Sequence, residues 1–344
     1  MSEPLLSVDE LEVTFRTEDG AVRAVDRVSF GLERGEVVSI VGESGCGKSV
    51  TAMSLMGLTE GPNASVGGSV RLDGQELVGA DGETLRAVRG DRMAMVFQNP
   101  MTSLNPVHRI GNQIVEQIRA HRDVGKREAM DRAVELLDAV GVPDAEERAR
   151  SYPHEFSGGM RQRAMIAMAL SLDPEILIAD EPTTALDVTI QAQIIELLRK
   201  LNRERGLAVI LITHDLGVVA EIADRVAVMY AGRIVETGSL DEVFYDPRHP
   251  YTWGLLGSVP RVGGERPKRL AQIEGQPPSL LNPPSGCRFR ARCPHAFNMC
   301  ESEPELIARG EPGDHLDRCW LEIAERPVLR ELPSGQIGLG VPTS

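Results

Sequence analysis

The chain has 344 residues, of which 42% are hydrophobic, 26% are charged and 4% are aromatic, and its formal net charge is −14. This composition is typical of a globular protein with one large domain or two ordinary ones, and the negative charge argues against an overall nucleic-acid-binding face. We expect neither a signal peptide nor a membrane-spanning segment, because no window nears the roughly 18–20 consecutive apolar residues that cross a bilayer.

Short apolar runs alternate with helix-like segments along the first part of the chain. The runs predicted as strands are residues 36–42, 175–182, 207–215 and 225–238, and the amphipathic segments predicted as helices are residues 127–141 and 188–206. The first three runs are almost continuously apolar, which is typical of parallel strands covered on both faces. This alternation predicts an α/β fold with a parallel sheet.

The composition changes near residue 246, and we place a boundary at about 245. Of the 22 prolines, 14 lie in residues 247–344, which also contain many turn signals. Such a tail could be a linker or disordered, but its cysteines and its two tryptophans, Trp253 and Trp320, indicate that part of it is ordered.

The segment GESGCGKS, Gly42–Ser49, follows a predicted strand directly and opens a predicted helix. This is the strand–loop–helix context of a phosphate-binding loop, in which backbone N–H groups and the helix N-terminus approach phosphate oxygens. Lys48 would reach the β- and γ-phosphates and Ser49 would ligate Mg²⁺. The alternative is a glycine-rich turn with a chance lysine. Cys46 is interpreted as a small filler residue rather than a reactive thiol.

Two acidic residues, Asp180 and Glu181, end the apolar run ILIAD. A carboxylate at a strand tip can hold Mg²⁺, and the next one can act as a general base toward water. Taken alone, the pair could simply be an acidic strand end before Pro182. Together with the phosphate loop it indicates a nucleotide-hydrolysing site.

The segment FSGGMRQR, residues 156–163, resembles the signature motif of ATP-binding-cassette ATPases. The usual motif is leucine-serine-glycine-glycine-glutamine, so Phe156 and Met160 are departures while Ser157, Gly158 and Gly159 are intact. A serine and two glycines that open a helix form a second anion site. In that family the signature closes on the nucleotide of the other subunit, which implies an ATP-sandwich dimer.

Other motifs of that family occur in order. Gln98 resembles its Q-loop glutamine, Asp187 its D-loop aspartate and His214 its switch histidine, which contacts the γ-phosphate. Phe15 is the candidate for the aromatic residue that stacks on adenine, although a strand phenylalanine is more often part of the core.

The resemblance spans about residues 5–245 and implies a RecA-like P-loop core, an antiparallel β subdomain near the N-terminus and a helical subdomain at about 99–170. It implies ATP hydrolysis with Glu181, His214 and Lys48 as catalytic residues and Mg²⁺ held through Ser49, Gln98 and Asp180. The implied nucleotide-binding residues are Phe15, Gly42, Ser44, Gly45, Cys46, Gly47, Lys48, Ser49, Val50, Gln98 and Asp180.

Four further segments resemble the dipeptide/oligopeptide importer branch, which also includes importers of nickel and other small solutes. They are residues 99–114, 181–194, 246–252 and 274–280. The resemblance implies a peripheral subunit at the cytoplasmic face of the membrane. Its implied partners are a second ATPase in a heterodimer, two transmembrane permease subunits and an extracytoplasmic solute-binding protein. The alternatives are import of nickel or another small solute, and a soluble ATPase that moves no solute.

Four of the five cysteines lie in the C-terminal extension, which we place at residues 246–344 after a nucleotide-binding domain at 1–245. Cys287, Cys293, Cys300 and Cys319 are separated by five, six and eighteen residues. Structural zinc favours pairs two to four residues apart, and disulfides are rare in reducing compartments. A 4Fe–4S cluster takes four thiolates at more variable spacing, and the importer resemblance also implies it. Zinc and metal-free buried thiols stay open. The basic run CRFRARC could bind nucleic acid or acidic lipid, but local ion pairing fits the net charge better.

Overall fold

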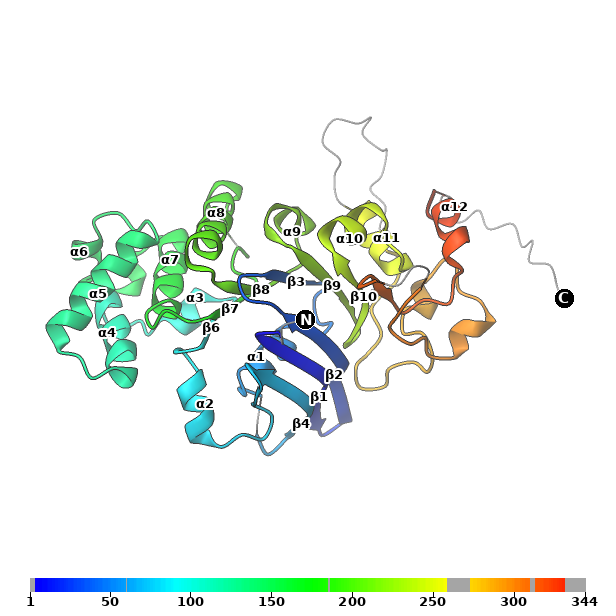
Figure 1. The fold of residues 1–344 in the computed structure, drawn as a ribbon, viewed down its shortest axis with the longest axis horizontal. Coiled ribbons are helices and arrows are strands. Elements are labelled where there is room, and N and C mark those ends of the chain that lie inside the picture. The colour runs from blue at the N-terminus through cyan, green and yellow to red at the C-terminus, as the bar shows by residue number, and fades with distance from the viewer. Residues whose placement is uncertain (1–3, 60, 185, 259–272, 310–312, 332–344) are drawn as a thin grey trace.

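The apolar runs expected as strands lie at the centre of the main sheet (Figure 1). The computed structural model describes residues 4–59, 61–184, 186–258, 273–309 and 313–331. Within these ranges the main sheet contains, in spatial order, β11 (Ile307–Ala308), β12 (Leu316–Asp317), β10 (Arg233–Ser239), β9 (Arg225–Tyr230), β3 (Val37–Val41), β8 (Ala208–Thr213), β7 (Ile176–Asp180) and β6 (Met93–Val96). The strands from β9 to β6 are parallel, and β10 and β12 continue the sheet antiparallel. Every residue of β3, β7 and β8 is buried, as expected for strands covered on both faces.

A second, antiparallel sheet lies below the main one in Figure 1. Its strands in spatial order are β2 (Gly20–Leu32), β1 (Leu6–Thr17), β4 (Ala64–Leu72) and β5 (Gln75–Glu76). The helix α1 (Lys48–Leu55) lies between the sheets, where Ala52 and Leu55 share one hydrophobic cluster with Leu6 of β1 and Ile40 of β3. The phosphate loop that precedes α1 is therefore fixed by two sheets at once.

Helices beyond β6 form a separate layer at one end of the main sheet (Figure 1). They are α3 (Pro100–Ser103), α4 (Ile110–His121), α5 (Lys126–Ala139), α6 (Ala145–Arg148) and α7 (Gly158–Ala169), with the 3₁₀ helix η1 (Pro153–Glu155) before α7. The buried residues of α5 are Ala129, Ala133, Leu136 and Leu137, which form one apolar stripe. That stripe packs into a cluster with residues of α4 and α7, so these helices share a core.

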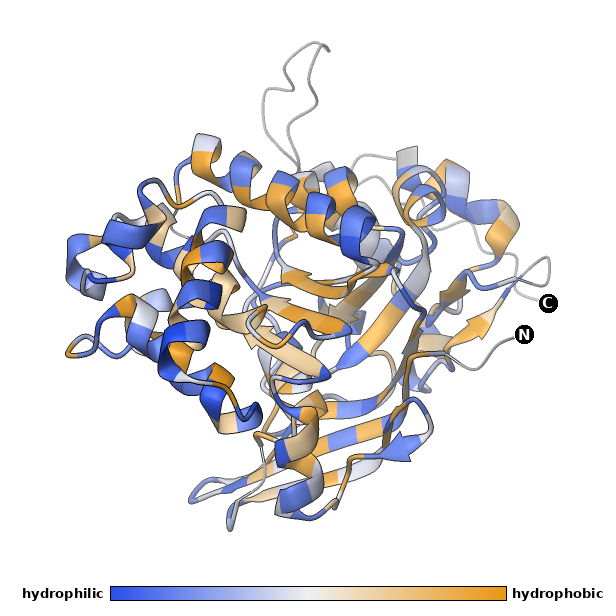
Figure 2. Ribbon diagram, turned by 60° about the vertical axis from the view of Figure 1, so that its left-hand side comes forward, coloured by the Kyte–Doolittle hydropathy of each residue, from blue (hydrophilic) through white to orange (hydrophobic). Residues whose placement is uncertain are grey.

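Other helices cover the face of the main sheet opposite the antiparallel sheet. They are α8 (Val188–Arg205), α9 (Leu216–Ile222), α10 (Leu240–Tyr245) and α11 (Pro250–Gly257), while α2 (Gly82–Val88) follows β5. Figure 2 shows hydrophobic residues concentrated on the strands and on the inward sides of these helices. In the described part of the chain, no helix combines the length and apolar character needed to cross a membrane.

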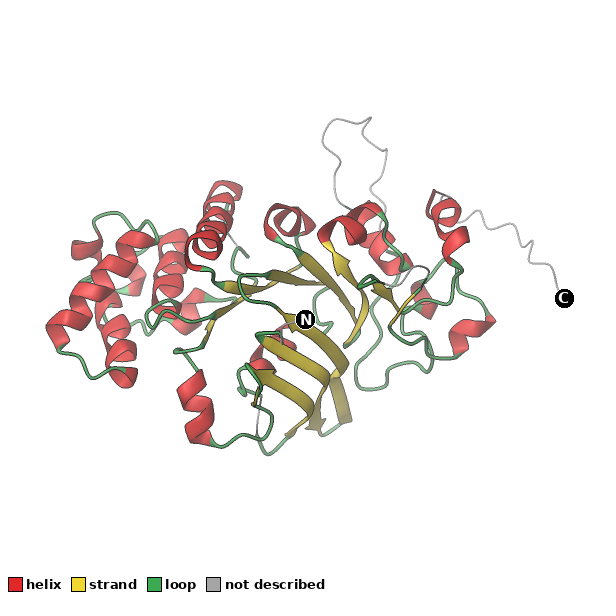
Figure 3. Cartoon of the chain, viewed as in Figure 1, coloured by secondary structure: helices red, strands yellow, loops and turns green. Residues whose placement is uncertain are grey.

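The described parts of the C-terminal extension are mostly loop with short helices (Figure 3). Besides α11, these are the 3₁₀ helices η2 (Arg290–Arg292), η3 (Asn298–Glu301) and η4 (Ile323–Glu325) and the helix α12 (Arg326–Glu331). β12 pairs with β10, and Phe289 packs at 5.3 Å between ring centroids against Tyr230 of β9. The extension thus continues the main sheet and shares a hydrophobic cluster with it.

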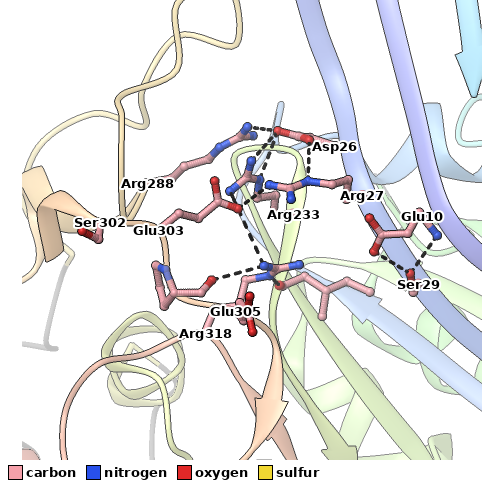
Figure 4. Close-up of polar contacts among 12 residues, drawn as sticks. Glu10, Asp26, Arg27, Ser29, Arg233, Arg288, Ser302, Glu303, Glu305 and Arg318 are labelled. Carbon is pink, nitrogen blue, oxygen red and sulfur yellow. Dashed lines mark hydrogen bonds and ion pairs between the residues drawn. The ribbon is translucent and has the colours of Figure 1, made fainter. Parts of the chain in front are cut away.

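A buried ionic network fastens the extension to both sheets (Figure 4). Asp26 of β2 is fully buried and forms ion pairs with Arg233 of β10 at 2.8 Å and with Arg288 of the extension. Glu303, also in the extension, pairs with Arg27 at 2.5 Å and with Arg233. Burial alone would raise the pKa of Asp26, but Arg288 and Arg233 outweigh it and hold that pKa below its usual value.

Candidate functional site

The phosphate loop connects β3 to α1, and its glycines are required by close backbone contacts. A Cβ atom at Gly42 would lie 2.1 Å from the Met229 carbonyl oxygen, and one at Gly47 would lie 2.3 Å from the Ala24 carbonyl oxygen. Gly47 also has a φ of 110°, which side-chain-bearing residues rarely adopt. Only glycine therefore lets this loop wrap tightly enough to present its N–H groups at the start of α1.

Lys48 lies under this loop with its side chain buried. Its Nζ donates hydrogen bonds to the carbonyl oxygens of Gly42 at 2.7 Å and Glu43 at 3.1 Å. Cys46 is also buried, and burial raises the pKa of its thiol. A neutral, enclosed thiol agrees with the interpretation of Cys46 as a filler residue. Ser44 and Gly45 are exposed at the tip of the loop, and Ser49 and Val50 are half-buried at the start of α1.

Asp180 and Ser49 meet at the carboxyl end of the sheet. Ser49 Oγ donates to Asp180 Oδ1 at 3.1 Å across the boundary between α1 and β7. The Asp180 side chain is buried, and this burial raises the pKa of its carboxyl group. Two oxygen donors at this distance fit the preference of Mg²⁺ for oxygen ligands, and a cation there would offset the cost of the buried carboxylate.

Glu181 is held in an unusual backbone conformation next to Asp180. Its φ of 47° lies in the left-handed region, and its N–H donates to the Ile212 carbonyl oxygen at 2.8 Å. Strained backbone of this kind costs about 1–3 kcal/mol and gathers at functional sites. In this conformation the Glu181 carboxylate lies within reach of Gln98 and His214.

Three side chains contact the Glu181 carboxylate. Thr184 Oγ1 donates to Oε2 at 2.7 Å, Gln98 Nε2 donates to Oε2 at 3.0 Å, and His214 Nδ1 lies 3.4 Å from Oε1. Burial alone would raise the pKa of Glu181, but Thr184 and His214 lower it on balance. Glu181 therefore stays ionised, as a base that polarises water must be.

The sheet topology explains why these residues converge. Gln98 follows β6, Asp180 and Glu181 end β7, and His214 follows β8, and these strands are parallel neighbours. Side chains that follow parallel strands meet at the same edge of the sheet, where α/β proteins bind ligands. Of the three predicted magnesium ligands, Ser49 and Asp180 contact each other, whereas Gln98 donates to Glu181. Thr184 was not among the residues predicted from the sequence, because no sequence pattern indicates its contact with Glu181.

The signature segment lies apart from this edge. Ser157 caps α7, because its Oγ accepts a hydrogen bond from the Met160 N–H at 3.3 Å. Ser157 and Gly158 are exposed, whereas Phe156 is buried and anchors the segment. In the described residues no hydrogen bond or ion pair joins Ser157–Met160 to Gly42–Ser49. Asp187 caps α8 in the same way, by accepting from the Ile190 N–H at 3.0 Å.

Phe15 lies on β1 with its side chain partly buried against the cluster shared by the two sheets. This packing accounts for Phe15 as part of the core, and its contact with adenine stays a prediction.

The four extension cysteines gather in one neighbourhood. Cys300 and Cys319 are buried, Cys287 and Cys293 are half-buried, and the Cys287 N–H donates to the Cys300 carbonyl oxygen at 3.0 Å. Burial above all, together with the nearby thiols of Cys319, Cys287 and Cys300, raises the pKa of Cys293 to about 12. All five cysteines are free thiols. Among the described residues, however, no three histidine, cysteine or acidic side chains are placed to hold a metal ion, so the predicted four-cysteine metal site is not confirmed.

Comparisons with known proteins agree with this geometry. Residues 25–184 match the ABC transporter family, and residues 235–300 match the C-terminal region of oligopeptide/dipeptide transporters. The oligopeptide transport ATP-binding protein OppD of Salmonella typhimurium is 52% identical over 321 residues, covering 93% of this chain and 95% of that relative. The dipeptide transport ATP-binding protein DppD of Bacillus subtilis is 51% identical over 334 residues, covering 95% and 98%.

Solved structures extend the comparison to the fold. The dimeric structure of MJ0796, a bacterial ABC transporter cassette, matches with a TM-score of 0.61 and 30% identity, covering 68% of this chain and 98% of that one. A dimeric post-hydrolysis state of the same cassette, bound to ADP and Pi, matches with a TM-score of 0.62, 29% identity and the same coverage. The chain therefore has the RecA-like cassette fold of an ABC ATPase and belongs to the ABC transporter family, among the oligopeptide and dipeptide transport ATP-binding proteins.

Proposed function

We propose that this chain is the ATP-hydrolysing subunit that powers import of dipeptides or oligopeptides. The observation that carries the proposal is the convergence of Lys48, Asp180, Glu181 and His214 at one edge of the parallel sheet, within a chain about half identical to peptide transport ATP-binding proteins. ATP binds at this edge, and its hydrolysis drives the transport cycle.

The roles of the site residues follow from their positions. Lys48 and the loop N–H groups receive the phosphates of ATP, and Ser49, Asp180 and Gln98 would hold Mg²⁺, which would offset the charge on the phosphate oxygens. Glu181 accepts a proton from the attacking water, and His214 contacts the γ-phosphate. Thr184 and Gln98 orient the Glu181 carboxylate for this task. Catalysis of this kind depends on positioning and electrostatics.

A second ATPase subunit completes the site. The start of α7, where Ser157 and Gly158 are exposed and Gly159 and Met160 follow, would be an anion site for the nucleotide of another subunit. We propose a heterodimer with a related ATPase, in which Asp187 lies near the same interface. The dimeric MJ0796 cassettes support such an assembly.

The remaining partners follow from the transport role. We propose that two transmembrane permease subunits dock on the segment after Gln98, where Met101 and Val107 are 55% and 74% exposed, at the cytoplasmic face of the membrane. An extracytoplasmic binding protein would deliver the peptide. The division into a nucleotide-binding part at 1–245, with a helical subdomain at about 99–170, and an extension at 246–344 belongs to the same proposal.

For the extension cysteines we propose a 4Fe–4S cluster, with zinc as the alternative. Four thiols in one buried neighbourhood supply the donor set that such a cluster needs. Burial raises the pKa of Cys287, Cys293 and Cys319, so binding of the cluster would release protons from these thiols. Iron, sulfide and zinc analysis of the anaerobically purified chain distinguishes the two.

Substitution of the proposed base tests the proposal. In the assembled transporter, Glu181→Gln keeps the size of the side chain and removes the base, so ATP turnover should fall at least about 100-fold. Glu196→Gln is the matched control, because Glu196 lies on the outside of α8 with its side chain 69% exposed. Unchanged turnover in Glu181→Gln would remove Glu181 from the mechanism.

A further inference from the structure

The extension holds the phosphate loop from outside, through Glu43, the second residue of the loop. Arg292 Nη1 donates to Glu43 Oε2 at 2.7 Å, and Arg292 Nη2 donates to Glu43 Oε1 at 3.0 Å. This is a bidentate, charge-assisted ion pair, which fixes the orientation of the two side chains as well as the distance between them. The side chains of Arg292 and Glu43 are 5% and 26% exposed, so solvent screens the pair less than it screens a surface ion pair.

Arg292 is itself fixed by several other contacts. Its Nε donates to the Glu274 carbonyl oxygen at 3.0 Å, and its Nη2 also donates to the Ile273 carbonyl oxygen at 3.2 Å. Its guanidinium carbon lies 5.8 Å from the ring centre of Tyr230, whose hydroxyl accepts from Nη1 at 3.4 Å. The Arg292 side chain is therefore held in one position between β9 and the extension, unlike a mobile surface side chain.

The backbone of Glu43 is held as well. Its N–H donates to the hydroxyl of Tyr251 at 2.9 Å, and Tyr251 is fully buried in α11. The carbonyl oxygen of Glu43 accepts from Lys48 Nζ. Two residues beyond position 245 thus determine where Glu43 lies, and Glu43 in turn contacts the lysine proposed to bind phosphate.

We propose that Arg292 is a positioning residue for the nucleotide site, which holds the phosphate loop in its binding geometry through Glu43. The inference rests on the proposed ATP site. Because a loop that is already ordered loses less conformational entropy when a ligand binds, the Arg292–Glu43 pair should increase the affinity for a nucleoside triphosphate. Arg292 touches no reacting atom and acts only through Glu43.

The position of Arg292 links the nucleotide site to the cysteine segment. Arg292 ends η2 and directly precedes Cys293, and its N–H donates to the carbonyl oxygen of Phe289, which is buried. The segment from Cys287 to Cys293 must therefore fold as seen here for Arg292 to reach Glu43. The extension is on this account a structural part of the ATP site.

Nucleotide binding to the full-length chain tests the inference. Dissociation constants for a fluorescent ATP analogue with Mg²⁺ would be measured for wild type, Arg292→Met, Arg292→Lys, Glu43→Gln and the double variant with Arg292→Met and Glu43→Gln. We expect about tenfold weaker binding for Arg292→Met, which lies within the usual range of coupling between sites. Arg292→Lys should weaken binding less, because lysine keeps the positive charge but cannot make the bidentate contact with the Glu43 carboxylate.

Glu43→Gln separates positioning from simple electrostatics. Removal of a negative charge beside the phosphate site should tighten ATP binding if Arg292 acts only through its charge. If Arg292 acts by positioning, Glu43→Gln weakens binding about threefold, and the double variant binds no more weakly than Arg292→Met alone. Arg290→Met is the matched control, because Arg290 lies in the same η2 helix and, among the described residues, its one ion pair is with the exposed Glu301 at 3.7 Å.

The outcomes separate the two proposals. Weaker binding in Glu43→Gln and Arg292→Lys, with unchanged binding in Arg290→Met, supports the inference even if Arg292→Met fails to fold. Wild-type affinity in both Glu43→Gln and Arg292→Lys, or tighter binding in Glu43→Gln, overturns it. If the wild-type chain itself binds no ATP, the proposed function fails instead.

Discussion

The nucleotide edge of the main sheet and the C-terminal extension are held together by different forces. At the edge, the side chains rest on parallel strands whose residues are all buried, and the His214 side chain stays 61% exposed. The extension shows the opposite arrangement, because several of its charged side chains are buried and its backbone is mostly irregular. There is little regular structure, and its fixed points are buried charges such as Asp317, which pairs with Arg326 at 3.0 Å. The edge is thus stabilised by a backbone hydrogen-bond ladder, whereas the extension relies on buried ion pairs together with the hydrophobic cluster around Phe289.

This difference predicts where the loss of a charged side chain lowers the stability of the fold. Ligand-binding groups at the strand ends can be exposed, because the strands beneath them keep their positions. A segment held by buried ion pairs tolerates the loss of a partner poorly, because the other charge stays buried and unpaired. Substitutions of charged residues should therefore affect stability in the extension and activity at the edge.

The largest effect on stability is expected for Asp26→Ala. This change leaves Arg288 and Arg233 buried near each other without their carboxylate, which should lower the free energy of unfolding by about 3–5 kcal/mol. Urea unfolding of the full chain measures this, with Asp19→Asn, at an exposed turn position, as control. A loss below about 1 kcal/mol, as is typical of surface ion pairs, would show that the network does not hold the extension.

A smaller effect on stability is expected when the pH falls, and we attribute it to His249 in the extension. Burial, with Arg326 nearby, lowers the pKa of His249 from 6.5 to about 3. The unfolded chain therefore binds a proton that the folded chain excludes, so stability falls as the pH drops below 6.5. Between pH 6.5 and 5 this single residue should cost about 2 kcal/mol.

His249→Asn tests that assignment. Asparagine keeps the helix-capping acceptor that His249 Nδ1 provides to the Tyr251 N–H at 3.1 Å. The variant should lose less stability than wild type when urea unfolding is repeated at pH 6.5 and pH 5. Equal losses in the two proteins would mean that His249 is not the group that titrates.

The smallest effect is expected at the nucleotide edge, for Asp180→Asn. Because burial raises the pKa of Asp180, its charge is a cost in the absence of a cation. Asp180→Asn should raise the melting temperature of the nucleotide-free chain by about 2 °C. It should also abolish the further rise in melting temperature that Mg²⁺ and ATP cause in wild type. A lower melting temperature for the variant, or a melting temperature that still rises with Mg²⁺ and ATP, would contradict the claim that Asp180 lowers stability in favour of function.

The same comparison explains what could be predicted from the sequence. The strands at 36–42, 175–182 and 207–215 were predictable because continuous apolar runs bounded by glycine or proline have few other structures, and they became β3, β7 and β8. The residues that follow them were predictable because a parallel sheet brings the ends of its strands together. The left-handed conformation of Glu181 and its contact with Thr184 depend on the packing around them and leave no sequence pattern.

The extension was harder to predict for a physical reason. Asp26 and Arg288 are 262 positions apart, and a single charged residue carries no sign of its distant partner. The pairing of β12 with β10 involves only two residues of each strand, which is too short for a periodic pattern. The contact of Arg292 with Glu43, 249 positions away, was invisible for the same reason.

Peptide uptake by the assembled transporter tests the central claim most directly. The transporter, in vesicles with its permease subunits and binding protein, would be given ATP and a labelled dipeptide or oligopeptide, with nickel as a second solute. We predict ATP-dependent peptide uptake by wild type and by Glu196→Gln, and none by Glu181→Gln. Uptake of nickel without peptide would contradict the proposed solute, and peptide uptake by Glu181→Gln at the wild-type rate would contradict the claim that this edge of the sheet powers import.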